Sequence, residues 1–268
     1  MAEWQPVVEI SYKTIVVERR GPVCSITLNK PPMNIIDIEM MDEIQAVLRE
    51  LEEAGNDSGV RVLVLRGAGE KGFSAGVSIQ DHTPDRIGAM IHRFHDIIRR
   101  LSRTNLVTLA VVHGLCLGGG FELVSICDLV VASDNSQLGQ PEIKLGQLPP
   151  VAVVLLPYLV GYHKAAELIL TGESIGAREA LALGLVNRVV PQGDLSGCVE
   201  SLLAGLMDKS ASTLRLGKSI LRRVAGEGFE KALDESERFF LQSLVPTEDA
   251  QEGVFAFLEK RAPQWRHR

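Results

Sequence analysis

Two glutamates and two runs of small residues are the parts of the sequence that could perform chemistry. Gly118, Gly119 and Gly120 follow an apolar run, and Glu122 lies two residues further on, at the start of a predicted helix. Unpaired N–H groups and partial positive charge gather at a helix start, so such a turn can hold an oxygen that becomes negative during a reaction. Three glycines alone favour a tight structural turn, so the inference needs a second feature.

The second feature is the run Phe73-Ser74-Ala75-Gly76, which follows another predicted buried strand. Small residues at this place let a second backbone N–H approach the same point. In an α/β sheet, ligands bind beyond the carboxyl ends of the strands. Two small-residue loops after neighbouring strands therefore indicate a shared binding site.

Glu122 and Glu142 are the candidate acid–base groups. The helix that carries Glu122 is apolar on nearly all sides, which predicts that the carboxylate is buried, and a buried carboxylate needs a partner or a purpose. Glu142 follows Pro141 and is predicted at a loop end or in the first turn of a short helix. For both residues the alternative is an acid that complements a helix dipole. If the two converge, they suit acid–base work on a water molecule.

The patterning predicts an α/β architecture with a mostly parallel sheet. Residues 12–17 and 23–28 alternate as a β-hairpin, and the apolar runs 60–65, 107–112 and 129–132 are predicted strands. Helices are predicted at 35–53, from Thr83 as N-cap onward, and at 121–126. We expect residues 1–192 to form this core with the active site, and residues 193–268 to form three or four helices.

Composition excludes several classes of protein. The 268 residues carry a net charge of −6 without a clustered basic face, so no nucleic-acid partner is expected. No run of about 18 apolar residues predicts a membrane span, and residues 1–9 show no secretory signal. The four cysteines form no C-x-x-C pair, which favours a reduced, cytoplasmic compartment.

Three other motifs carry less weight. Residues 67–72 match G-x-G-x-x-G, but a loop is predicted after them where a dinucleotide site needs a helix. His92 and His95 lie three apart on a helix without a further ligand, so no metal site is expected. Ser74 and Ser78 lack the G-x-S-x-G setting of a hydrolase nucleophile.

Taken together, residues 73–76, 118–123 and 138–143, with 170–172, 177–186 and 256–261, resemble the crotonase (enoyl-CoA hydratase/isomerase) superfamily. The likeness covers nearly the whole chain. It implies a spiral of ββα units followed by a C-terminal helical region that builds trimers, often paired as hexamers. It also implies an acyl-CoA substrate, with coenzyme A as part of that substrate and no permanently bound cofactor.

The resemblance assigns roles to individual residues. It implies that the amides of Ala75 and Gly119 bind the thioester oxygen. Glu122 and Glu142 match the two glutamates of the hydratases, and we expect Glu142 to donate the proton and Glu122 to act as the base. Members with other reactions often lack one of these glutamates, so the presence of both favours hydration.

The resemblance also implies how coenzyme A is held. Lys71 and the loop from Gly67 to Ser74, which includes Phe73, would lie near its phosphates and adenine, and Ala75 is also expected to contact coenzyme A. Phe257 and Lys260 match positions that reach coenzyme A from the end of the chain, in the same or a neighbouring subunit.

The sequence departs from ordinary fatty-acid hydratases in two places. Residues 147–153 read QLPPVAV where a glycine-rich run is usual, and Val77-Ser78 replaces the usual Ala-Asp. With residues 31–34 and 81–84, these departures resemble the cyclic dienoyl-CoA hydratases of anaerobic aromatic degradation, which implies a cyclohexa-1,5-diene-1-carbonyl thioester as substrate. The alternatives are an isomerase or a CoA-thioester hydrolase of the same fold, or an RNA-binding homologue, which would need a basic surface.

Overall fold

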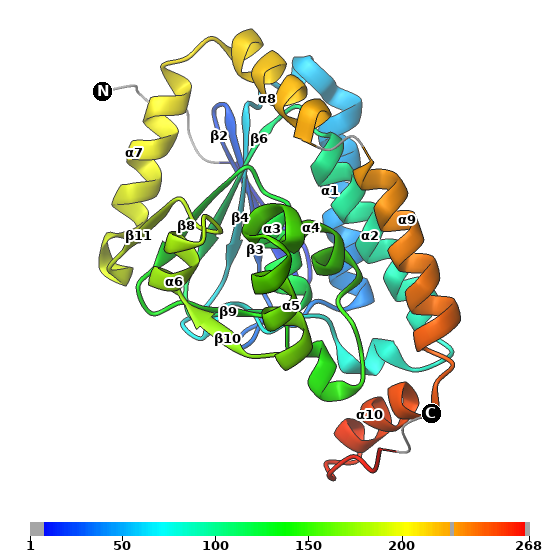
Figure 1. Cartoon of the computed structure of the whole chain (residues 1–268). Coiled ribbons are helices and arrows are strands. Elements are labelled where there is room, and N and C mark those ends of the chain that lie inside the picture. Colours follow the sequence, from blue (N-terminus) through cyan, green and yellow to red (C-terminus); the bar gives the residue numbers. More distant parts are fainter. Residues whose placement is uncertain (1–7, 226–227, 266–268) are drawn as a thin grey trace.

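The protein is described by a computed structural model that covers residues 8–225 and 228–265. Its centre is a twisted seven-stranded sheet in the order β1-β2-β3-β4-β6-β8-β11 (Figure 1). The strands are β1 (Val8–Ser11), β2 (Ile15–Arg20), β3 (Val23–Leu28), β4 (Val62–Gly67), β6 (Val107–Val112), β8 (Leu129–Ser133) and β11 (Arg188–Val190). β1, β2 and β3 pair antiparallel, which confirms the predicted hairpin, and β3 to β11 pair parallel.

A smaller sheet lies at the carboxyl ends of these strands. Its order is β10-β9-β7-β5, from β5 (Gly72–Ser74), β7 (Leu115–Leu117), β9 (Gln137–Gly139) and β10 (Ser174–Gly176). β5 follows β4, β7 follows β6 and β9 follows β8, each after a short connection, and a helix comes next each time. This recurrence is the predicted spiral of ββα units.

The central strands are buried on both faces. In β4, Leu63 and Leu65 join the apolar cluster under α1 (Ile38–Ala54) and α2 (Ile87–Arg103), whereas Val62 and Val64 join the cluster under α7 (Leu195–Met207). Successive side chains of a strand point to opposite faces, so a continuous apolar run is what a sheet covered on both sides requires. Figure 1 shows α1 and α2 on one side of the sheet and α7 on the other.

The start of α2 differs from the prediction. Thr83 was expected as its N-cap, but the helix begins at Ile87, and the Thr83 carbonyl accepts the N–H groups of Arg86 and Ile87 in a preceding turn. The buried carboxylate of Asp81 accepts from the Ile38 N–H and pairs with Arg86. These contacts hold the segment before α2 in a turn, and they were invisible in the local pattern.

The remaining helices all follow β7 in the chain. They are α3 (Gly119–Ser125), α4 (Pro150–Val160), α5 (Tyr162–Thr171), α6 (Ala177–Ala182), α8 (Ala211–Ala225), α9 (Phe229–Phe239) and α10 (Glu248–Leu258), with a π-helical turn at Phe240–Leu244. The helices after residue 193 confirm the predicted helical region. They also complete the core, because α7 covers the sheet and Ser236 of α9 donates to the Pro150 carbonyl at 2.8 Å.

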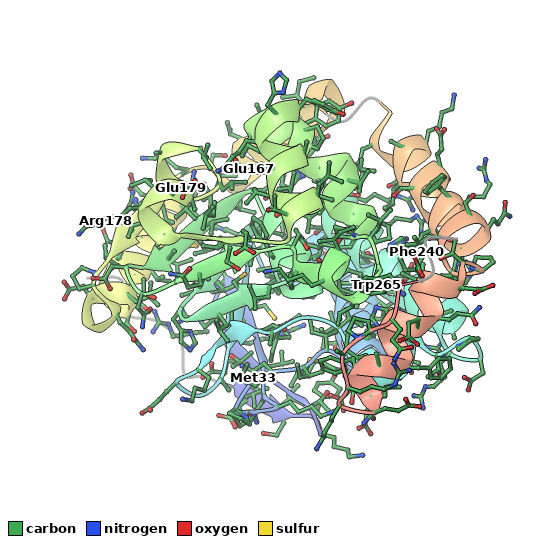
Figure 2. All side chains as sticks on the ribbon, turned by 60° about the horizontal axis from the view of Figure 1, so that its bottom comes forward. Met33, Glu167, Arg178, Glu179, Phe240 and Trp265 are labelled. Atoms are coloured by element: carbon green, nitrogen blue, oxygen red, sulfur yellow. The ribbon has the colours of Figure 1, made fainter. Side chains whose placement is uncertain are left out.

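The C-terminal segment packs on the turn Pro141–Leu145, which carries Glu142. A Cβ placed on Gly253 of α10 would lie 1.9 Å from the Leu145 carbonyl oxygen, so only glycine permits this approach. Trp265, labelled in Figure 2, lies against Gly146, where an ideal Cβ would be 3.3 Å from its ring. α10 and Trp265 therefore support the turn that forms one wall of the site. Within residues 8–225 and 228–265, no helix has the length and apolarity that crossing a bilayer requires.

Candidate active site

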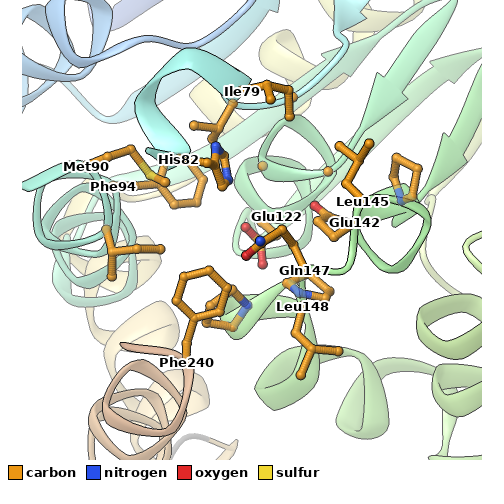
Figure 3. A pocket seen from close by; sticks show the side chains of 18 of the residues that line it. Ile79, His82, Met90, Phe94, Glu122, Glu142, Leu145, Gln147, Leu148 and Phe240 are labelled. Atoms are coloured by element: carbon orange, nitrogen blue, oxygen red, sulfur yellow. The ribbon is translucent and has the colours of Figure 1, made fainter. Parts of the chain in front are cut away.

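Four of the predicted site residues line one cavity of about 90 Å³ beyond the carboxyl ends of the strands (Figure 3). These four are Ala75, Gly119, Glu122 and Glu142. Their convergence was the one geometric condition that the sequence could not test. Its apolar lining includes Met90, Ile91 and Phe94 of α2, Leu148 just before α4, and Phe240 of the π-helical turn.

Glycines allow the two loops to meet. A Cβ on Gly120 would lie 2.8 Å from the Ser74 Cβ, and one on Gly118 would lie 2.7 Å from Oε1 of Glu142. Gly118 also has a φ of 53°, in the left-handed region that favours glycine. The sequence 118–120 is thus a close-approach turn that brings α3, the Ala75 loop and the Glu142 carboxylate together.

The two predicted oxyanion donors differ in whether their N–H group already makes a hydrogen bond. The Gly119 N–H is at the first position of α3 and has no hydrogen-bond partner among the described residues. The Ala75 N–H donates to the Met33 carbonyl at 2.9 Å. Gly119 is therefore ready to bind an oxygen, whereas Ala75 must exchange or share an existing bond.

Glu122 is buried and held by the start of α4. Its Oε1 accepts the N–H groups of Val151 at 3.0 Å and Ala152 at 2.9 Å. Burial raises the pKa of Glu122 from 4.5 to about 7, although these two hydrogen bonds oppose the rise. The sequence analysis missed Val151 and Ala152 as the groups that fix this carboxylate. Pro149 and Pro150 were the available signal, because proline favours a helix start, where the following N–H groups are unpaired.

Glu142 stands on the single 3₁₀ turn Pro141–Leu145, with Pro141 at its first position and Gly146 ending it at a φ of 66°. Burial, and then the negative charge of Glu122, raise the pKa of Glu142 well above 4.5. When the side-chain amide of Gln140 is oriented with its nitrogen toward Glu142, this nitrogen donates to both carboxylate oxygens at 3.1 Å. Two carboxylates with raised pKa values that line one cavity are suited to acid–base catalysis.

Of the residues predicted to hold coenzyme A, Ala75 lines this cavity, and the other five do not. Phe73 and Ser74 are buried in β5, where the Ser74 hydroxyl donates to the Asn34 carbonyl, so only their main-chain atoms could reach a ligand. Lys71 is exposed beside β5, and Phe257 and Lys260 are exposed at the end of α10. Their contact with coenzyme A stays a prediction.

The two helical histidines have a structural partner. Nδ1 of His92 and Nδ1 of His95 both lie against Glu237 of α9, at 2.9 and 2.6 Å. In the described part of the chain, no group of three or more His, Cys, Asp or Glu side chains is placed to hold a metal ion. Residues 67–72 run directly into β5 with no helix, and the four cysteines are unpaired.

Comparisons with known proteins agree with this geometry. Residues 18–268 match the family model described as enoyl-CoA hydratase/isomerase. A Mycobacterium tuberculosis protein named "Probable enoyl-CoA hydratase echA8" is 38% identical over 265 residues, covering 97% of this chain and 100% of the relative. The cyclohexa-1,5-dienecarbonyl-CoA hydratase of Thauera aromatica is 32% identical over 252 residues, covering 94% and 96%.

The fold is also found in a solved structure. The crystal structure of an enoyl-CoA hydratase from Mycobacterium avium subsp. paratuberculosis superposes with a TM-score of 0.84 at 28% identity, covering 95% of this chain and 99% of the other. The ββα spiral, the paired glutamates and the match over residues 18–268 together lead to one assignment. The chain belongs to the enoyl-CoA hydratase/isomerase family, the crotonase superfamily.

Proposed function

We propose that the protein is an enoyl-CoA hydratase that adds water to a double bond conjugated with a CoA thioester. One observation carries this proposal: two carboxylates with raised pKa values line the same small cavity as the unpartnered N–H of Gly119. An isomerase or a thioester hydrolase needs the oxyanion site but can work with a single carboxylate, so the presence of both Glu122 and Glu142 favours hydration.

In this proposal the thioester oxygen binds the Gly119 N–H, and the Ala75 N–H turns to it from the Met33 carbonyl. Addition of water gives the thioester enolate character, so negative charge develops on that oxygen. Donors fixed in advance stabilise this charge more than the neutral carbonyl, which lowers the barrier. Removal of one such donor typically costs about 3 kcal/mol.

The glutamates divide the proton transfers. Glu122 accepts a proton from water as the oxygen forms its bond to the β-carbon, and Glu142 delivers a proton to the α-carbon. The sum is one added water, with one proton gained by Glu122 and one lost by Glu142. A proton that passes back between the carboxylates restores the pair.

For the acyl group, we propose a compact ring, as in cyclohexa-1,5-diene-1-carbonyl-CoA, with a 6-hydroxycyclohex-1-ene thioester as product. The cavity is about 90 Å³ and has Phe94, Leu148 and Phe240 in its wall, which suits a short flat group better than a long chain. The relative from Thauera aromatica also favours this choice. The mycobacterial relative has the higher identity and is named for enoyl-CoA in general, so an acyclic enoyl group is the alternative.

Binding partners follow from the exposed surface. Lys71, Phe257 and Lys260 are exposed and available to the coenzyme A moiety, in the same or a neighbouring subunit. Large apolar side chains such as Tyr158 and Tyr162, each 74% exposed, support a homo-oligomer, a trimer or a hexamer. We place the protein in the cytoplasm, consistent with its unpaired cysteines, and its net charge of −6 argues against a nucleic-acid partner.

A product assay tests the function. Crotonyl-CoA and cyclohexa-1,5-diene-1-carbonyl-CoA are each incubated with the protein, and products are identified by mass spectrometry. We expect a mass gain of one water, with the cyclic thioester turned over faster. A shifted alkene of unchanged mass would make the protein an isomerase, and release of free coenzyme A would make it a hydrolase.

A further inference from the structure

The nucleophilic water needs more hydrogen-bond acceptors than the two glutamates supply. A water molecule carries two O–H groups, and in a closed cavity an unpaired O–H is unfavourable. Oxygen Oε1 of Glu122 already accepts two N–H groups, which leaves Oε2 for one O–H. Glu142 serves as the proton donor in the forward reaction, so the second O–H of the water requires a third group.

Three other polar side chains border the cavity: His82, His95 and Gln147. Within the described residues, Nε2 of His95 and Oε1 of Gln147 have no hydrogen-bond partner, but both atoms are covered by surrounding protein. The ring of His82 is only half-buried, and Figure 3 shows it extending into the cavity from the side of Ile79 and Phe94. His82 is therefore the accessible acceptor.

The ring of His82 is fixed in the state that this role needs. Its Nδ1 lies 2.9 Å from the Ser78 carbonyl, which can only accept, so Nδ1 carries the hydrogen. Burial lowers the pKa of His82, which keeps the ring neutral and leaves a lone pair on Nε2. The neighbouring Asp81 accepts from the Ile38 N–H and pairs with Arg86 at 2.7 Å, so the turn that presents the ring is anchored.

We propose that His82 positions the nucleophilic water: its Nε2 accepts the second O–H of that water and afterwards the O–H of the hydroxylated product. This inference rests on the proposed hydratase function. His82 transfers no proton and stays neutral throughout. Because the unsaturated substrate has no hydroxyl at this place, the contact affects turnover and product binding, and it leaves substrate binding nearly unchanged.

Two variants of matched shape test the role. His82→Met removes the acceptor, and His82→Gln has a similar length but keeps an acceptor oxygen. We expect His82→Met to lower kcat about tenfold with KM nearly constant, and His82→Gln to recover most of the loss. In His82→Met the Kd of the hydroxyacyl-CoA should rise about tenfold, whereas the Kd of the saturated acyl-CoA should stay nearly the same. The ratio of the saturated to the hydroxyacyl Kd should therefore fall about tenfold. Equal kinetics and equal ratios in the two variants would overturn the proposal.

A measurement on the wild-type protein does not depend on the folding of a variant. With ¹⁵N-labelled histidine, addition of the hydroxyacyl-CoA should shift the Nε2 resonance of His82, whereas the saturated acyl-CoA should leave it in place. The absence of this difference would also overturn the role. If the wild-type protein hydrates no enoyl-CoA, the proposed function itself fails. If the wild-type protein hydrates an enoyl-CoA and His82→Met has the same kcat and the same product affinity, only the proposed role of His82 fails.

Discussion

Replacement of Glu122 by glutamine should stabilise the fold at alkaline pH while abolishing activity. The pKa of Glu122 is about 7 in the folded protein, against 4.5 for an ordinary glutamate. Its folded pKa is raised, so the stability linked to its protonation is fully present below about pH 4.5 and is lost as pH rises through about 7. At about 1.4 kcal/mol per pKa unit, this gap corresponds to about 3 kcal/mol. Glutamine does not ionise and keeps a carbonyl oxygen for the Val151 and Ala152 N–H groups.

The assay is urea unfolding of the wild-type protein and Glu122→Gln at about pH 5 and about pH 8. We expect the variant to gain about 2 to 3 kcal/mol over the wild type on going from the lower to the higher pH, because only the wild type loses stability through Glu122. In the proposed mechanism the same ionisation supplies the base, so wild-type kcat should rise with pH through about 7. An equal difference in unfolding free energy at both pH values would refute the reasoning.

Three further substitutions follow from the same geometry. Glu142→Gln should fold, by thermal melting, and lose several orders of magnitude in kcat, because no proton donor is left for the α-carbon; near-normal turnover would contradict that role. Gly119→Ala should lower kcat/KM sharply, because the added Cβ would lie 2.6 Å from Val77 Cγ2 and would displace the turn at residues 118–120. Unchanged hydration kinetics would contradict this. Gly253→Ala should cost about 1 to 3 kcal/mol in urea unfolding, because its Cβ would lie 1.9 Å from the Leu145 carbonyl oxygen; an unchanged unfolding free energy would show that α10 does not hold this wall.

The framework of the fold was predictable because its signals are local. Residues 62–65 and 107–112 are buried on both faces of the sheet, and the apolar runs that predict this are legible in the sequence. The hairpin of β2 and β3 and the helical character after residue 193 were predicted for the same reason. The start of α2 was misplaced because Asp81 contacts Ile38, 43 residues earlier, and no local pattern records that contact.

The site was predictable only in part. The two glutamates and the glycine turn were identified from their residue types, and the resemblance named their roles. The state of the Ala75 amide depends on the carbonyl of Met33, a backbone atom in a distant loop, and backbone partners leave no trace in residue identity. The same holds for the amides of Val151 and Ala152 that fix Glu122. His82 was noted only within residues 81–84 and not as a site residue, because the direction of its ring is not legible in the sequence.

The most direct test is a crystal structure of the wild-type protein with a saturated acyl-CoA, which cannot be hydrated. The account predicts the thioester oxygen within about 3 Å of both the Gly119 and the Ala75 nitrogens, with Met33 released or sharing its bond. The β-carbon should then face Glu122 and Glu142. A thioester oxygen bound elsewhere, with the Gly119 N–H left unpaired, would contradict it.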